Sequence, residues 1–331
     1  MTTRREFLQA SAASLTTGLA LADEPKPTGN KPKVGCLSWC FHPFSPRADQ
    51  EQAIEIIGQL GFDGLELILI ARSDLQDYWT DDRLAAMVKQ LGRHKLGLAQ
   101  FVMFQPVVEG LSSVNADERA RNLDYFEAGC KIGKKLGAPM VNIVAPWARE
   151  LKGPTGYLPR YYDLENPKLN EKFHIDIASG FDWDRVWEGY IAATKGCLER
   201  AKAHGLKLTI EHHTHTLIPD AVSFLRLWDA IRDPALGYNL DTGWTLSQRE
   251  YPPVALHKVK KHLMNIHVRD IDGMMRKFVH VGTGVMDFKH VAETVQRIGY
   301  TGYLSIEQDK FPGDMKETCK RYVTMMREYL T

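Results

Sequence analysis

The chain alternates short apolar runs with longer segments of helical spacing eight times, and this alternation restricts its possible folds more than any other feature. Several of the longer segments end in a glycine directly before the next apolar run, as at Gly61, Gly137 and Gly205, and glycine commonly ends a helix. Eight strand–helix units in a row favour a parallel sheet, and eight is the number that closes into a (β/α)8 barrel. We expect strands at Val34–Trp39, Gly64–Ile70, Leu96–Val102, Met140–Ala145, Lys207–Glu211, Leu236–Asp241, Met264–Arg269 and Gly302–Glu307. We expect helices at about Asp49–Leu60, Asp81–Gly92, Asn115–Leu136, Asp184–His204, Ala221–Ile231, Pro253–Lys261 and Phe288–Ile298, with a last helix that runs to Leu330.

An open, doubly wound sheet is the alternative arrangement of these units. No Gly-x-Gly-x-x-Gly motif follows the first expected strand, where a dinucleotide-binding sheet would need it. The 331 residues also fit one barrel with additions, since such barrels run to about 250 residues or more. We therefore expect a single α/β domain over residues 34–331, a (β/α)8 TIM barrel.

The first 22 residues have the three parts of an export signal. Arg4 and Arg5 form a twin-arginine pattern, a stretch of small and apolar residues follows, and Ala20-Leu21-Ala22 is a cleavage signal. The stretch is shorter than the roughly 20 apolar residues that a spanning helix needs. The sequence predicts a twin-arginine signal peptide over 1–22, a linker over 23–33, and a periplasmic or otherwise extracytoplasmic protein without a membrane span. An amphipathic N-terminal helix that stays attached is the alternative.

The connection after the fourth expected strand is unusually long, at about 38 residues over 146–183. Long loops of this kind are usually either functional or disordered, and the aromatic residues in this one argue against disorder. It leaves the carboxyl end of a strand, which is the face where barrel active sites are built. It is predicted to be either a partial lid over a pocket or a subunit-interface flap.

Four consecutive expected strands end on residues that can bind a metal ion. These are Glu211, Asp241, His267 and Glu307. A buried carboxylate costs several kcal/mol unless it is paired or coordinated, so three of them at one barrel mouth need a cation. Carboxylate and imidazole ligands suit one divalent ion of Mn, Co, Mg, Fe or Zn, and the lack of thiolates argues only against the softest metals.

Several short motifs add to this pattern, and in order and spacing they resemble the xylose isomerase-like barrel superfamily, in particular its sugar isomerases and epimerases. The matching segments are Gly61-Phe62-Asp63-Gly64-Leu65-Glu66-Leu67, Ile210-Glu211-His212-His213, Leu240-Asp241-Thr242-Gly243, Ile266-His267-Val268-Arg269-Asp270, Val281-Gly282-Thr283-Gly284 and Ser305-Ile306-Glu307. The resemblance implies that the metal is held by Glu211, Asp241, His267 and Glu307. It also implies that homo-oligomers are common, since members often form dimers or tetramers.

In the enzymes that this chain resembles, two Glu ligands lie on opposite faces of the substrate and move one proton. Glu211 and Glu307 match them as base and acid, and the proton comes from the carbon next to a carbonyl, through an enediolate. We expect a sugar isomerase or epimerase with an unphosphorylated small-molecule substrate. A lyase or hydratase that acts on an oxidised (3-keto) sugar or glycoside is one alternative, because it shares the first step. A non-catalytic carbohydrate-binding barrel is another.

Further residues near these motifs are candidates for substrate binding. His213 stands two residues after Glu211, so both side chains point to the same side of a strand. The structural alternatives are a hydrogen bond for His213 and a buried ion pair for Glu66 or Asp270. His212 and His215 are expected to be solvated loop residues. The full set of substrate-binding candidates is His213, Glu66, Trp39, Trp244, Arg269, Asp270 and His280.

Nucleic acid is excluded as a partner. The net charge is +1, whereas proteins that bind nucleic acid through phosphate contacts usually carry a basic face. The apurinic endonucleases of this superfamily use three zinc ions and extra His ligands. Many relatives carry His three residues after the Asp that ends the sixth strand, where this chain has Trp244, an aromatic residue that can stack on a sugar.

Five cysteines are scattered along the chain, which is an odd number. We expect them to be small buried hydrophobic residues. If the segment that carries Cys36 and Cys40 is extended, their sulfurs lie more than about 10 Å apart and cannot bridge.

Overall fold

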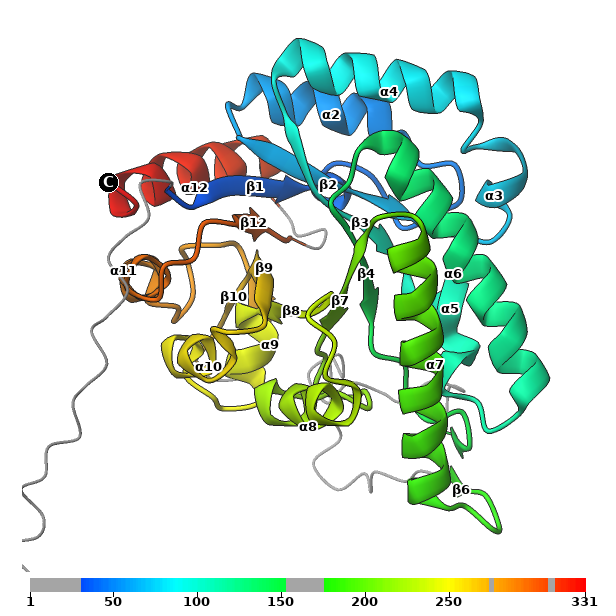
Figure 1. The fold of residues 1–331 in the computed structure, drawn as a ribbon. Helices are drawn as coiled ribbons and strands as arrows, with labels where there is room; N and C mark the ends of the chain where they lie inside the picture. The colour runs from blue at the N-terminus through cyan, green and yellow to red at the C-terminus, as the bar shows by residue number, and fades with distance from the viewer. Residues whose placement is uncertain (1–30, 153–175, 274–276, 309–312) are drawn as a thin grey trace, which may run out of the picture.

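Eight parallel strands close into a barrel that the helices surround (Figure 1), in a computed structural model that describes residues 31–152, 176–273, 277–308 and 313–331. The strand order around the barrel is β1-β12-β9-β8-β7-β4-β3-β2. Barrel strands that follow one another along the chain therefore lie side by side, and the last, β12, pairs with the first, β1. The predicted TIM barrel is confirmed, and the predicted strand bounds differ from the observed ones by at most two residues. The barrel strands are β1 (Lys33–Leu37), β2 (Gly64–Leu69), β3 (Gly97–Met103), β4 (Met140–Val144), β7 (Lys207–Glu211), β8 (Leu236–Asp241), β9 (Leu263–Val268) and β12 (Tyr303–Ile306).

The helices that follow these strands form the outer ring of the barrel (Figure 1). Local signals set their ends: Asn115 accepts from two backbone N–H groups at the start of α6, and Gly137 ends that helix with a φ of 82°. The long helices are α2 (Gln50–Gln59), α4 (Asp81–His94), α6 (Ala116–Leu136), α7 (Trp183–Ala203), α8 (Ala221–Ile231), α10 (Pro252–Val259), α11 (Phe288–Arg297) and α12 (Met315–Tyr329). The short ones are η1 (Ser38–Cys40), α3 (Asp74–Asp77), α5 (Gln105–Val108), η2 (Glu109–Ser112) and α9 (Thr242–Ser247).

Two small antiparallel sheets extend the loops that follow β4 and β9. In the long connection after β4, β5 (Leu151–Lys152) pairs with β6 (Asp176–Ile177). Residues 153–175 between them lie outside the described residues, so the choice between lid and interface flap stays a prediction. After β9, β10 (Asp270–Ile271) pairs with β11 (Phe278–Val279).

The predicted signal peptide over 1–22 and most of the linker over 23–33 also lie outside the described residues. Within the described part of the chain, we find no helix with both the length and the apolar character required to cross a membrane.

Alternation along the strands divides their side chains between the barrel interior and the helices. In β7, Leu208 and Ile210 are fully buried aliphatic residues of the hydrophobic core. The residues that alternate with them, Thr209 and Glu211, bond to partners on other strands inside the barrel. The interior of this barrel therefore carries polar groups, and some of them hydrogen-bond to the residues at its carboxyl end.

Candidate functional site

The four strand-end residues converge at the carboxyl end of the barrel. Each of Glu211, Asp241, His267 and Glu307 offers a ligand atom within 4.8 Å of those of the other three, and all four side chains are buried. β7, β8 and β9 end on or just after the first three, and Glu307 directly follows β12. These strands are neighbours in the barrel, which is why residues far apart in the chain meet here.

His267 lies at the centre of this cluster. Its Nδ1 is 3.3 Å from Oε2 of Glu211 and 3.0 Å from Oε2 of Glu307. Its Nε2 is 2.9 Å from Oε2 of Glu66, on the other side of the ring. Burial alone would lower the pKa of His267, but the carboxylates of Glu211 and Glu66 outweigh it and raise that pKa well above its usual value. Glu66 thus fixes the ring so that Nδ1 faces the cluster.

Asp241 provides the clearest test of whether this cluster fits a cation. Its Oδ1 accepts from the backbone N–H of Trp244 over 2.7 Å. Its Oδ2 has no hydrogen-bond partner among the described residues and is 3.6 Å from Nε of Arg269. Burial raises the pKa of this carboxyl well above its usual value. A buried carboxylate oxygen without a donor, beside two more carboxylates and an imidazole, fits a divalent metal ion.

The two glutamates are held differently. Burial opposes ionisation of Glu211, but His267 and His213 lower its pKa well below the usual range. His213 Nε2 is 3.1 Å from its Oε1. Glu307 accepts from Nη2 of Arg269 over 2.6 Å and from Nε1 of Trp39 over 3.3 Å. Arg269 is the largest influence that lowers the pKa of Glu307 against its burial.

A layer of fully buried polar side chains lies inside the barrel beneath the cluster. Asn239 donates to Oε2 of Glu211 over 3.1 Å, and its own oxygen accepts from Asn265 over 2.9 Å. Asn265 also donates to Glu66 over 2.8 Å. These bonds link the cluster to the strands on the far side of the barrel. Besides Glu66, the layer consists of Gln100, Asn142, Thr209, Asn239 and Asn265.

The prediction from sequence missed this layer, although a signal for it exists. Three of its members stand two residues before a residue of the cluster, so each pair points the same way into the barrel. The pairs are Thr209 with Glu211, Asn239 with Asp241, and Asn265 with His267.

The histidines after β7 are buried, contrary to the prediction that His212 and His215 are solvated. Only 1% of His212 and 8% of His215 is exposed. The ring of His212 stacks on Tyr238 with centroids 5.3 Å apart. Burial lowers the pKa of His212 to about 3, so the ring is neutral at physiological pH. The prediction was wrong because residues of the next strand and helix pack on these rings, Tyr238 and Thr245 on His212 and Trp244 on His215, which spacing alone does not reveal.

Trp244 is also fully buried, in helix α9 directly after Asp241. Its indole lies against the ring of His213, with centroids 4.4 Å apart, and meets Phe278 edge-on. The indole therefore packs against the His213 ring and restricts its position. It leaves no exposed indole surface for the predicted stacking on a sugar.

The structure places two other predicted substrate-binding residues outside the cluster. Asp270 is buried, and its carboxylate accepts backbone N–H groups of Gly282, Gly284 and Met286 over 2.8–3.0 Å. It therefore organises the loop that follows β11. His280 is hydrogen-bonded through Nδ1 to Thr318 in α12, at 3.1 Å.

Comparison with known proteins agrees with this architecture. The profile of the xylose isomerase-like TIM barrel family matches residues 54–328. The chain belongs to this family.

Curated proteins similar to this chain include inosose dehydratases, at low identity. The protein of Lacticaseibacillus casei is 23% identical over 167 residues, which cover 44% of this chain and 54% of that protein. The protein of Bacillus velezensis is 27% identical over 226 residues, which cover 62% of this chain and 68% of that protein. The chain thus spans about half the length of the first of these relatives.

Solved structures with this fold include sugar epimerases. A D-psicose 3-epimerase from Clostridium cellulolyticum superposes with a TM-score of 0.69 at 17% identity, covering 90% of this chain and 99% of its own. The 3-keto-D-glucoside 4-epimerase from E. coli superposes with a TM-score of 0.68 at 15% identity, covering 90% of this chain and 100% of its own. At these identities the likeness establishes the fold.

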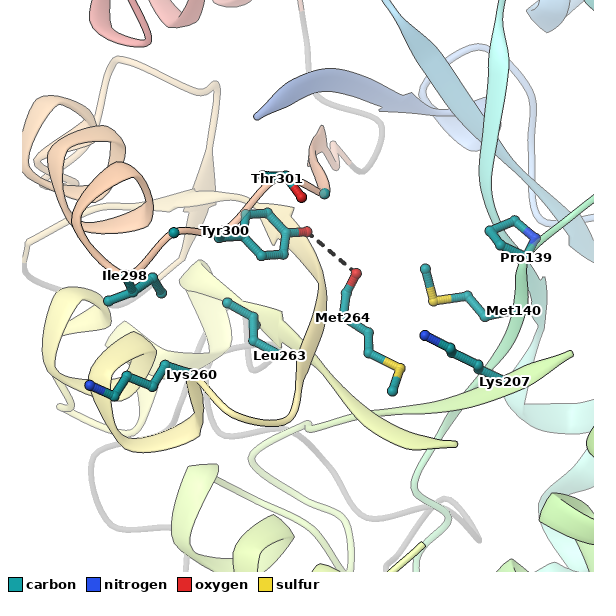
Figure 2. Close-up of a pocket in the computed structure, with 11 residues that line it drawn as sticks. Pro139, Met140, Lys207, Lys260, Leu263, Met264, Ile298, Tyr300 and Thr301 are labelled. Carbon is teal, nitrogen blue, oxygen red and sulfur yellow. Dashed lines mark hydrogen bonds between the residues drawn. The ribbon is translucent and has the colours of Figure 1, made fainter. Parts of the chain in front are cut away.

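This xylose isomerase-like barrel has a cavity at the end opposite the cluster. A cavity of about 350 Å³ lies where β4, β7 and β9 begin. Figure 2 shows the side chains of Met140, Lys207 and Met264 that line it. Lys207 and Met264 lie at the start of β7 and β9, whose other ends carry Glu211 and His267, so the cavity takes no part in that site.

Proposed function

We propose that the protein is a divalent-metal-dependent sugar isomerase or epimerase. The observation that carries this proposal is the convergence of Glu211, Asp241, His267 and Glu307 at the carboxyl end of the barrel. In the proposal these four residues hold one ion of Mn, Co, Mg, Fe or Zn. When bound, a divalent ion would polarise a substrate carbonyl and make the neighbouring C–H more acidic.

Glu211 and Glu307 exchange the proton in this proposal. The low pKa of Glu211 keeps it ionised at neutral pH, which is the form that accepts a proton. His213 and Asn239 orient its carboxylate. Glu307 is held by Arg269 and Trp39; it takes up a proton from solvent and delivers it to the substrate, while the proton on Glu211 is released to solvent. Return to the same carbon from the other face gives epimerisation, and return to the neighbouring carbon gives isomerisation.

A metal-dependent lyase is the second candidate, and the curated relatives favour it. Those relatives are named inosose dehydratases, and dehydration begins with the same proton abstraction. The hydroxyl group on the next carbon then takes up a proton from the acid and leaves as water, in place of reprotonation of the first carbon. An oxidised (3-keto) sugar or glycoside, or a related cyclic ketone, would be the substrate.

We also propose that the protein is exported by the twin-arginine route and acts outside the cytoplasm. Arg4, Arg5 and the Ala20-Leu21-Ala22 cleavage signal support this. Mass spectrometry of the N-terminus in an extracytoplasmic fraction tests it: a chain that begins at Asp23 is expected, and an intact Met1 terminus would contradict the proposal.

A solvent-exchange experiment separates the candidate reactions. The metal-loaded protein is incubated in D₂O with unphosphorylated ketohexoses, 3-keto-glycosides and inosose, and products are analysed by NMR and ultraviolet absorption. An epimerase or isomerase puts deuterium into a sugar of unchanged composition, whereas a lyase gives a conjugated ketone that has lost water. Binding without either product would support the non-catalytic barrel.

Glutamate variants assign the two roles. Glu211→Gln and Glu307→Gln are each expected to abolish deuterium incorporation while substrate binding persists. Glu55→Gln is the matched control, since Glu55 lies on α2, outside the cluster, and binds His94. Exchange that survives in both site variants would overturn the proposed acid–base pair.

A further inference from the structure

Three cysteines form a buried cluster that the proposed function does not use. Cys36 lies in β1, Cys40 ends the short helix η1, and Cys319 lies in α12. Their sulfurs all lie within 4.8 Å of one another, and each side chain is at most 6% exposed. The predicted separation of Cys36 and Cys40 is wrong, because η1 turns the chain directly after β1 and brings Cys40 back over the strand.

We propose that Cys36, Cys40 and Cys319 form a second metal site, which takes a soft, thiophilic cation of the Cu(I) type. Metal–sulfur bonds of about 2.3 Å place the sulfurs around a shared ion about 4 Å apart. A disulfide requires about 2.05 Å between two sulfurs and would leave the third unused. All three sulfurs lie within 4.8 Å of one another and all three cysteines are free of disulfides, so the cluster fits a shared ion.

The number and type of ligands select the cation. Among the described residues, no His, Asp or Glu joins the three thiols. Structural zinc is almost always four-coordinate, whereas three sulfur ligands alone satisfy Cu(I). The carboxylate cluster has the opposite character, with oxygen and imidazole ligands, so the two sites would sort hard from soft ions.

The three thiols act on one another electrostatically. Hydrogen bonds from Cys36 and Cys40 lower the pKa of Cys319, while burial raises the pKa of both neighbours well above the usual value. Thiolate is the form that binds metals, so a cation that binds here displaces the thiol protons.

The cluster lies directly behind the wall of the candidate site. Cys40 Sγ is 3.7 Å from the carbonyl oxygen of Ile306, and the adjacent residues Trp39 and Glu307 are hydrogen-bonded to each other. A bound ion would tie η1 to α12 and so fix the position of Trp39 against Glu307.

Copper binding tests this proposal without reference to activity. The full chain is produced in copper-supplemented cells and purified without oxygen, and the reduced apoprotein is also titrated with Cu(I)–acetonitrile against a Cu(I) chelator. Copper content and X-ray absorption at the copper edge are measured for the wild type, Cys319→Ala and Cys40→Ala. Cys197→Ala is the matched control, because Cys197 is equally buried but lies in α7.

We expect about one copper ion per wild-type chain, coordinated by sulfur only. The wild type and the control should bind Cu(I) at least tenfold more tightly than the two cluster variants. The absorption spectrum of the wild type tests the site even where a variant folds poorly. A shell of nitrogen and oxygen, unchanged copper in Cys319→Ala, or no uptake by either route would overturn the proposal. So would uptake of zinc in place of copper, or a disulfide found by mass spectrometry in the purified protein.

Discussion

The substitution Glu66→Gln probes the buried anchor beneath the candidate metal site. Oε2 of Glu66 is 2.9 Å from Nε2 of His267 and accepts from Gln100 over 2.8 Å, while Oε1 accepts from Asn265 over 2.8 Å. Every neighbour therefore presents a donor to this carboxylate. A glutamine in the same place has one acceptor and one NH₂ group, and the NH₂ group would face a donor.

The expected cost follows from this arrangement. At least one hydrogen bond to a charged acceptor is lost in a fully buried site, which lowers the free energy of unfolding by about 1.5–3 kcal/mol. The ring of His267 also loses the partner that orients it. Loss of such an outer partner typically weakens metal binding by about 10–100-fold, so we expect that range here.

Urea unfolding and calorimetric titration with Mn²⁺ measure the two effects, with Glu55→Gln as the control. Glu55 and His94 have the same 2.9 Å contact between Oε2 and Nε2, but the Glu55 side chain is 41% exposed where that of Glu66 is 0% exposed. The control is expected to leave stability and metal affinity unchanged. If Glu66→Gln behaved like its control, the buried layer would not be anchoring His267, and this reasoning would be refuted.

Three other perturbations give distinct outcomes. Asp270→Asn removes the charge that accepts backbone N–H groups of the loop after β11, so it is expected to lower the free energy of unfolding by about 2 kcal/mol while Mn²⁺ affinity stays unchanged. His212 has a pKa of about 3 in the fold against about 6.5 when unfolded, so only the unfolded chain binds its proton as the pH falls from 7 to 5. The free energy of unfolding therefore falls between pH 7 and pH 5. Urea titrations at these two pH values should show a fall about 2 kcal/mol larger in the wild type than in His212→Phe. Equal falls would contradict the neutral buried ring. Mn²⁺ at 100 times its Kd should raise the free energy of unfolding by about 2.7 kcal/mol, and stabilisation that persists in Asp241→Asn would place the ion elsewhere.

Periodicity and strand ends were enough to predict the barrel and the convergence of its carboxyl-end residues. The eight-fold alternation determines which segments pair, and parallel strands bring their carboxyl ends to one edge. Glu211 and Glu307 could therefore be placed together from the sequence, although 95 residues separate them.

The parts that could not be predicted depend on where loops turn after the strands end. Cys40 approaches Cys36 because η1 follows β1 at once, and a strand pattern does not reveal such a turn. His212 is buried because its ring meets Tyr238 and lies 3.3 Å from the hydroxyl of Thr245, both of which come from the next strand and helix. Contacts of this kind are set by tertiary packing rather than by local pattern.

The most direct test of the central claim is the metal content of the folded, full-length protein, measured by elemental analysis beside Asp241→Asn. The account predicts about one Mn, Co, Mg, Fe or Zn ion per wild-type chain and a near-complete loss in the variant, because Asp241 Oδ2 is left without a donor among the described residues. A wild-type protein that holds none of these ions, even after reloading with Mn²⁺, Co²⁺ and Zn²⁺, would contradict it.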